Sequence, residues 1–147
     1  MLLADALVYA GRYQPAAVVD IATLTGTCAA ALGGVAAGVF STDDVLLNQL
    51  QSASDATGEK LWPLPLFPEY GEAIKSQTAD VKNSGGKGGG IGASAVFLQR
   101  FTSYPAWAHI DMAGLAFDAK DNPYVPGKGA TGFGVRLLTE FVRNWRR

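Results

Sequence analysis

Three short segments of the sequence contain residue types at spacings that could support binding or catalysis. In the first, residues 20–26 (DIATLTG), an apolar run ends in a turn of small and hydroxyl-bearing residues. Gly26 would let the backbone approach a ligand closely, and free N–H and C=O groups would project from such a turn. The simpler interpretation is an ordinary strand-to-helix turn in which Thr25 caps the helix. The residue types alone favour the ordinary turn and leave a binding site as the alternative.

The second segment, residues 84–92 (SGGKGGGIG), has six glycines in nine residues before an apolar stretch. It resembles a phosphate-binding loop, but no Gly-Lys pair is followed by Ser or Thr, so it is not a P-loop. A G-x-G-x-x-A dinucleotide pattern begins at Gly90, with Asp111 about twenty residues further on. That pattern needs an apolar strand directly before it, whereas residues 78–84 are largely polar. We therefore predict a mobile or tightly packed loop in place of a dinucleotide site.

The third segment, residues 107–114 (WAHIDMAG), places His109 and Asp111 two positions apart on an expected strand. Such residues share a face and could bind one metal or form an acid–base pair. A catalytic zinc site commonly takes three protein ligands, and no third ligand stands beside these two. A structural, hydrogen-bonded role for His109, the one histidine of the chain, is therefore favoured. The sequence also lacks a nucleophile elbow, H-E-x-x-H and C-x-x-C, so residue types alone give no complete catalytic set.

Alternating and helical apolar periodicities predict the elements that position these segments. Strands are expected at residues 17–22, 35–41, 79–82 and 107–112. Helices are expected at residues 3–13, 28–32, 43–56, 69–76, 93–101 and 131–145. Residues 60–66 contain two prolines and suit an edge strand or a loop. The alternation indicates an α/β fold: a layered domain with a largely parallel or mixed sheet covered by helices, whose sites gather at the carboxyl ends of strands.

Composition narrows the class of protein. At 147 residues, with 48% hydrophobic and 17% charged residues, the chain should fold as one domain with a real core. Its formal net charge of -1 does not suggest a nucleic acid or an anionic membrane as partner. Residues 21–42 carry no charge, but they are too rich in Thr and Gly to suit a membrane-spanning helix. We expect the lone Cys28 to be a small buried residue in a reducing, cytoplasmic compartment.

The expected first helix has no N-cap residue, since residues 1–3 already fall within its apolar pattern. A chain that begins inside an apolar helix is expected to have lost the residues that preceded it. No secretory signal is recognisable, because Asp5 interrupts the apolar run and no basic region precedes it.

Five segments in fixed order resemble leucyl aminopeptidases, the M17 family of dinuclear metallo-aminopeptidases. They are residues 3–7 (LADAL), 20–26, 57–59 (TGE) with 62–66, 107–114 and 129–136 (GATGFGVR). The resemblance is collinear from the first residue to the last expected helix. It implies that residues 1–147 are the C-terminal part of an M17 catalytic domain, truncated at the N-terminus.

The resemblance also implies an activity. Intact members remove N-terminal residues such as Leu from peptides, using two divalent metal ions (Mn or Zn) that activate a water molecule. Their metal ligands and catalytic residues lie in segments that would precede residue 1. The resemblance therefore assigns no catalytic residue and no metal ligand to this chain, and we expect the isolated chain to be inactive. The alternative is a non-catalytic remnant or a binding module of the same fold.

What the resemblance does assign to this chain is substrate binding. The backbone of Leu24 and Gly26 would hydrogen-bond the main chain of the peptide. Thr23 would line the pocket for the N-terminal side chain, with Ala113 and Ala116 on the opposite wall. The glycine-rich segment would lie near the mouth of the site. Intact members commonly assemble as homohexamers, and we leave open whether a chain of this length does so.

Overall fold

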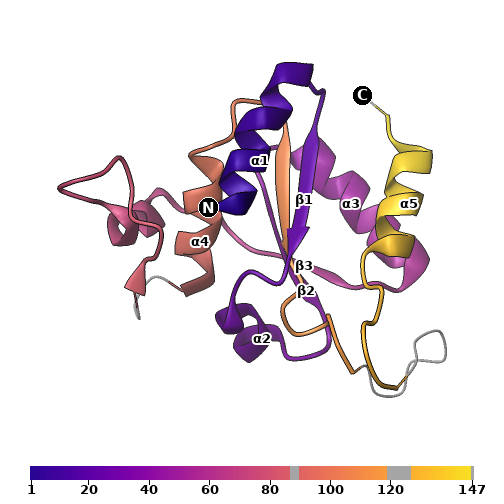
Figure 1. Cartoon of the computed structure of the whole chain (residues 1–147). Coiled ribbons are helices and arrows are strands. Elements are labelled where there is room, and N and C mark those ends of the chain that lie inside the picture. The colour runs from indigo at the N-terminus through magenta and orange to yellow at the C-terminus, as the bar shows by residue number, and fades with distance from the viewer. Residues whose placement is uncertain (87–89, 119–126, 147) are drawn as a thin grey trace.

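The computed structural model describes residues 1–86, 90–118 and 127–146 and confirms the expected α/β class. Four strands form one mixed sheet in the described chain, and helices cover both of its faces (Figure 1). The elements in chain order are α1 (Leu2–Ala10), η1 (Gly11–Tyr13), β1 (Val18–Ala22), α2 (Gly26–Leu32), β2 (Ala37–Ser41), α3 (Asp44–Thr57), β3 (Leu61–Pro63), η2 (Pro68–Ile74), α4 (Gly90–Gln99), β4 (Trp107–Asp111) and α5 (Val135–Asn144).

The strand order of the sheet is β1-β4-β2-β3. β1 pairs in parallel with β4, and β2 pairs in parallel with β3, but β2 runs antiparallel to β4. The sheet is therefore mixed. The short β3 lies at one edge and ends on Pro63, which agrees with the expected edge strand, because proline cannot donate to a further neighbour.

Two hydrophobic cores lie on opposite faces of the sheet. On β4, Ala108 and Ile110 face the core beneath α3 and α5, whereas Trp107 faces the core beneath α1 and α4. This two-residue alternation is the normal consequence of a strand with both faces covered. It also places His109 and Asp111 on one face of β4, as the sequence predicted, and this is the face of Trp107.

Several predicted boundaries need correction. Residues 79–82 form no strand: three of the four are exposed, and only Val81 packs against the core, so there is no buried face to pair. The helix expected at 69–76 is the 3-10 helix η2. The helix expected from 131 begins only at Val135, because Gly132 and Gly134 adopt positive φ angles of 69° and 93° that interrupt helical geometry.

The uncharged segment 21–42 is divided between the end of β1, α2 and β2 and forms no continuous helix. Among the described residues, none of the helices combines the length and apolar character needed to cross a bilayer. The glycine-rich segment 84–92 is partly helical, since α4 begins at Gly90, and residues 87–89 lie outside the described residues. At Gly92 a Cβ would lie 2.5 Å from the ring of Tyr70, so this glycine permits close packing of α4 on η2.

Candidate functional site

Residues 20–26 and 107–114 lie side by side where β1 and β4 end. β1 and β4 pair in register, with Ala22 opposite Asp111, so their carboxyl ends lie side by side. Beyond the strands, the Met112 amide donates to the Ala22 carbonyl over 2.8 Å. We call residues 23–26 the substrate turn and residues 112–118 the wall loop. Their placement at the carboxyl ends of neighbouring parallel strands is where sites form in open α/β sheets.

Asp111 joins the substrate turn to the wall loop. Its carboxylate is fully buried, with 0% of the residue exposed. Oδ1 accepts hydrogen bonds from the Leu24 amide at 3.1 Å and the Ala113 amide at 3.2 Å. Oδ2 accepts from the Thr25 amide at 3.1 Å and the Thr25 hydroxyl at 2.7 Å. Four donors on one carboxylate satisfy its oxygens and offset the cost of burying a charge.

The substrate turn is also a capped helix start. The Thr25 hydroxyl accepts a hydrogen bond from the Cys28 amide at 3.1 Å, which confirms Thr25 as the cap of α2. A Cβ on Gly26 would meet no atom within 4 Å. The Leu24 carbonyl accepts no hydrogen bond from any residue that the structure describes. The turn therefore combines a capped helix with an open carbonyl and open space at Gly26.

The structure brings only some of the predicted substrate-binding residues together. Thr23, Leu24 and Gly26 are exposed, and Ala113 and Ala116 are half-buried. Leu24 and Ala113 are brought together, because their amides share one oxygen of Asp111. Thr23 and Ala116 share no hydrogen bond in the described part of the chain, so their placement on opposite walls stays a prediction.

The wall loop is held by contacts on two sides. A Cβ on Gly114 would lie 2.1 Å from the Gly33 carbonyl oxygen, so only glycine fits between the loop and the end of α2. On the other side, the Thr131 hydroxyl donates to the Leu115 carbonyl over 2.5 Å, and the Thr131 amide donates to the Ala116 carbonyl over 3.0 Å. The wall is thus fixed to α2 and to the segment that leads into α5.

A cavity of about 310 Å³ lies beside the substrate turn. Leu24 lines it, together with residues of α4 and the described start of the glycine-rich segment, among them Ser84 and Gly85. The described start of the glycine-rich segment therefore lies close to Leu24, while its place at the mouth of a substrate site stays a prediction.

His109 and Asp111 share a face of β4, but their side chains have different hydrogen-bond partners. His109 Nδ1 lies 2.6 Å from Asp20 Oδ1, across the pair of strands in which Asp20 and His109 are in register. Asp20 Oδ2 accepts the indole N–H of Trp107 at 2.7 Å. His109 is 1% exposed. The structural interpretation of His109 is confirmed, while its partner Asp20 was missed, although two isolated polar residues in apolar strands are a signal of a buried pair.

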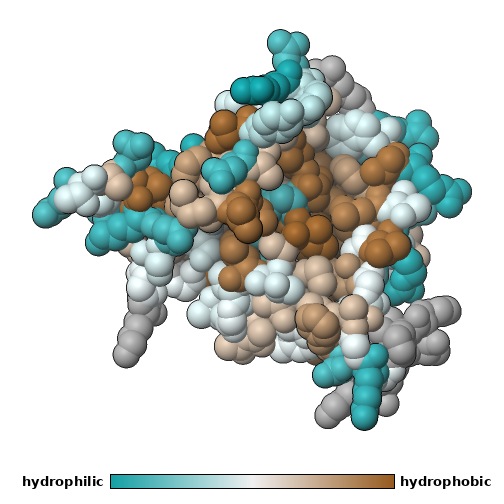
Figure 2. Space-filling view, viewed as in Figure 1, coloured by the Kyte–Doolittle hydropathy of each residue, from teal (hydrophilic) through white to brown (hydrophobic). Residues whose placement is uncertain are grey.

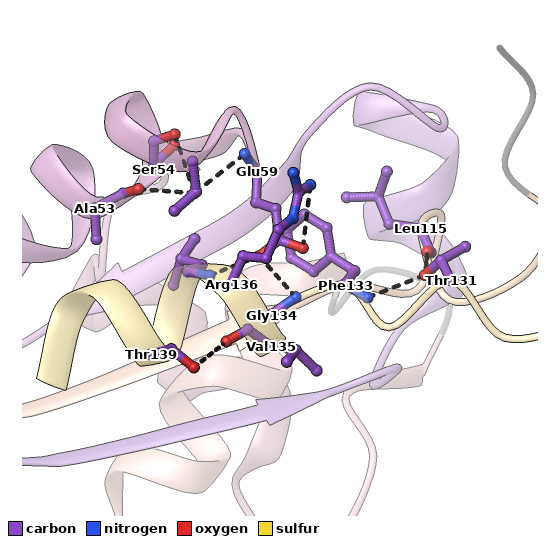
Figure 3. A network of polar contacts seen from close by, with 12 residues as sticks. Ala53, Ser54, Glu59, Leu115, Thr131, Phe133, Gly134, Val135, Arg136 and Thr139 are labelled. Carbon is purple, nitrogen blue, oxygen red and sulfur yellow. Dashed lines mark hydrogen bonds and ion pairs between the residues drawn. The ribbon is translucent and has the colours of Figure 1, made fainter. Parts of the chain in front are cut away.

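Glu59 belongs to a segment that resembles the family, but its structural role was not predicted from the sequence (Figure 3). This carboxylate is 6% exposed and comes from the turn after α3. Its Oε2 accepts from the amides of Gly134 at 3.2 Å and Leu137 at 2.8 Å, and its Oε1 lies 3.6 Å from Arg136 Nη2. Glu59 therefore caps α5 from a distant segment, where no cap was recognisable next to the helix in sequence.

The donor groups of this site do not fit a dinuclear metal centre. No group of three or more His, Cys, Asp or Glu side chains that could hold a metal occurs among the described residues. The oxygens of Asp111 and Asp20 already accept protein donors, and so does Oε2 of Glu59, whose Oε1 faces Arg136. A metal there would have to displace these buried hydrogen bonds.

The chain is similar in sequence and in fold to known proteins. Residues 1–139 match the model of the cytosol aminopeptidase family, catalytic domain. A probable cytosol aminopeptidase of Geobacter sulfurreducens is 54% identical over 143 residues, which are 97% of this chain and 29% of that protein. A probable cytosol aminopeptidase of Chlorobaculum tepidum is 50% identical over 147 residues, covering 99% of this chain and 29% of the relative. A mutant of tomato leucine aminopeptidase superposes with a TM-score of 0.87 at 42% identity, over 97% of this chain and 27% of that one. The chain thus spans about 29% of the length of the curated relatives it matches.

Proposed function

The chain belongs to the cytosol aminopeptidase family, and from that premise we propose that it forms the substrate-binding part of a metal-dependent leucyl aminopeptidase. The reaction is removal of N-terminal residues such as Leu from peptides. The cytoplasm is the proposed location, which accords with the name of the relatives.

The observation that carries the proposal is the convergence of the substrate turn and the wall loop on Asp111. The Leu24 carbonyl would accept an N–H of the peptide main chain, and the Gly26 N–H would donate to a peptide carbonyl. Thr23, Ala113 and Ala116 would line the pocket for the N-terminal side chain. Small residues there leave room for a group the size of Leu, and one methylene changes affinity by about 1–3 kcal/mol in such pockets.

The two metal ions of the family would be held by residues outside this sequence, since the buried carboxylates of this chain are already hydrogen-bonded to protein groups. When bound, such ions supply an activated water and stabilise the developing charge. The part played by this chain is to orient the peptide main chain and to accommodate its first side chain.

A chimera tests the proposed function. This chain would replace the matching 29% of the Geobacter sulfurreducens relative. We expect the chimera to hydrolyse a leucine anilide in a manganese-dependent way, and the isolated 147 residues to show neither hydrolysis nor tight two-site manganese binding by calorimetry. An inactive but folded chimera, or robust hydrolysis by the isolated chain, would contradict the proposal.

The substitution Ala113→Phe in the same chimera tests whether Ala113 lines the pocket for the N-terminal side chain. The larger side chain should fill the pocket and lower kcat/KM for the leucine anilide by about tenfold or more, with a smaller loss for the alanine anilide. Ala56→Phe, on the exposed surface of α3, serves as the matched control. Equal losses on both substrates would remove Ala113 from the pocket.

A further inference from the structure

We propose that Asp111 is a positioning residue that aims the Leu24 carbonyl at the peptide substrate and sets the spacing between the substrate turn and the wall loop. The inference rests on the proposed function, because the substrate turn is taken to bind a peptide. Asp111 itself is buried and would not touch the substrate.

Asp111 fixes the direction of the peptide units in the substrate turn. The Leu24 and Thr25 amides both donate to the Asp111 carboxylate, over 3.1 Å each. A trans peptide unit holds its C=O antiparallel to its N–H. Because the Thr25 N–H is directed at Asp111, the Leu24 carbonyl of the same peptide unit must point away from the buried carboxylate. This is the carbonyl that accepts no hydrogen bond within the described chain.

Asp111 also links the substrate turn to the wall loop. Asp111 Oδ1 binds the Leu24 amide from one side and the Ala113 amide from the other. These two residues are far apart in sequence and share no element, so this oxygen links them directly beyond the ends of the paired strands. Removing the carboxylate would release both segments at once, although the strands that carry them would remain paired.

The hydrogen bonds on Asp111 tether the substrate turn to the wall loop. Hydrogen bonds to an ionised, buried acceptor contribute more than neutral ones. Asp111→Asn keeps the shape of the side chain but replaces one oxygen by an NH2 donor. In either orientation of the amide, one pair of donors loses its acceptor: the Leu24 and Ala113 amides, or the amide and hydroxyl of Thr25.

Hydrogen exchange in the full 147-residue chain tests the tether directly. In Asp111→Asn, we expect the amides of Leu24 and Ala113, or that of Thr25, to exchange about tenfold faster than in the wild-type chain. The amides of β4 should keep their relative protection. Asp20→Asn is the matched control, since it also alters a carboxylate on this face of the sheet, but one bonded to His109 and Trp107. Unchanged protection of all three turn and wall amides in a folded Asp111→Asn chain would overturn the proposal.

Kinetics of the chimera then separate positioning from simple destabilisation. A misaimed carbonyl weakens binding of ground state and transition state alike, so KM for the leucine anilide should rise about tenfold with little change in kcat. Asp20→Asn should leave KM unchanged. A lower kcat at unchanged KM would indicate less folded enzyme and would overturn the positioning role. If the wild-type chimera were inactive, the proposed function would fail, while hydrogen exchange would still decide whether Asp111 holds the two segments.

Thr25 provides a second pair of variants if Asp111→Asn does not fold. Thr25→Val removes the hydroxyl bond to Asp111 together with the cap bond from the Cys28 amide, and should raise KM and loosen the Leu24 amide. Thr25→Ser retains the hydroxyl and should restore both. Identical behaviour of the two folded variants would contradict the proposal.

Discussion

The buried carboxylates of the described chain each join segments that are distant in sequence. Asp111 accepts the Leu24 amide 87 positions away, and Glu59 accepts the Leu137 amide 78 positions away. Both accept several backbone donors, so their charges are compensated by hydrogen bonds where water is excluded. At the scale of single residues, these carboxylates organise loops and a helix terminus, whereas the proposed substrate-binding surface consists of small residues and backbone groups.

Cys28 offers a test of burial at this scale. The residue is 1% exposed, and its thiol donates to the Asp111 carbonyl over 3.2 Å. Burial raises the pKa of this thiol above its ordinary value of 9.0, because the thiolate would lose its hydration. We therefore expect Cys28 to react with a disulfide reagent such as DTNB only slowly at pH 8, and rapidly once urea unfolds the chain. Fast labelling of the native chain would contradict the buried placement.

The raised pKa of Cys28 also makes the free energy of unfolding depend on pH. The unfolded thiol ionises at a lower pH than the folded one, so above the ordinary thiol pKa the unfolded state binds fewer protons than the folded state. The contribution of Cys28 to stability is therefore lost as pH rises past that value. Cys28→Ala should flatten this part of a plot of unfolding free energy against pH.

At the scale of elements, α5 shows how a helix can depend on a cap from another segment. Glu59→Gln should lower the free energy of unfolding by about 1–3 kcal/mol, because one of its buried acceptor oxygens is replaced by a donor and the charge at the helix N-terminus is lost. Urea unfolding followed by circular dichroism gives the measurement. Glu72→Gln is the control: Glu72 pairs with Lys75 at 2.7 Å, but both side chains are 69% exposed, and the change should cost less than about 0.5 kcal/mol. Equal effects would remove the capping role.

The contact between α2 and the wall loop depends on the absence of a side chain. Gly114→Ala would place a Cβ 2.1 Å from the Gly33 carbonyl oxygen, a backbone atom that cannot rotate aside. We expect a loss of about 1–3 kcal/mol or more in unfolding free energy, as in other overpacked sites. Gly26→Ala has no atom within 4 Å of its new methyl group and should be neutral or slightly stabilising. Thermal melts of both variants distinguish close packing from a general intolerance of alanine at glycine positions.

At the scale of the whole molecule, apolar surface gathers over β1 and between α1 and α5 (Figure 2). An apolar groove of about 410 Å³ lies here, lined by Ala16, Ala17, Val19, Leu138, Phe141, Val142 and Trp145. β1 is also an edge of the sheet in the described chain. An open edge strand beside an apolar groove is a surface that favours association.

The groove should bind a hydrophobic dye. We expect the folded chain to enhance the fluorescence of ANS, and Val142→Lys to reduce that enhancement by placing a charge at the groove, where Val142 is 69% exposed. Val135→Lys is the control on the same helix, because Val135 is similarly exposed at 66% but lies near Arg136 and Arg143 in a different cleft. Equal reductions would show that net charge, and not the groove, determines dye binding.

Much of this architecture could be predicted from the sequence, because it follows from local patterns. The strands at 17–22 and 107–112 and the helix after Asp43 follow from periodicity and capping residues close in sequence, and the structure places β1, β4 and α3 there. The family was also predictable, since its segments occur in fixed order along the chain. The candidate site was expected at the carboxyl ends of these strands, because sites in open α/β sheets gather there.

Only the tertiary structure decided which segments pair. The antiparallel direction of β2 against β4 and the absence of a strand at 79–82 depend on neighbours that are distant in sequence. Apart from the neighbouring Ala113 amide on Asp111, the hydrogen-bond partners of Asp20, Glu59 and Asp111 lie 75 to 89 positions away, so no local pattern identifies them. Periodicity reports which face of an element is buried, whereas hydrogen-bond partners depend on strand order and register, which arise only when the whole sheet has formed.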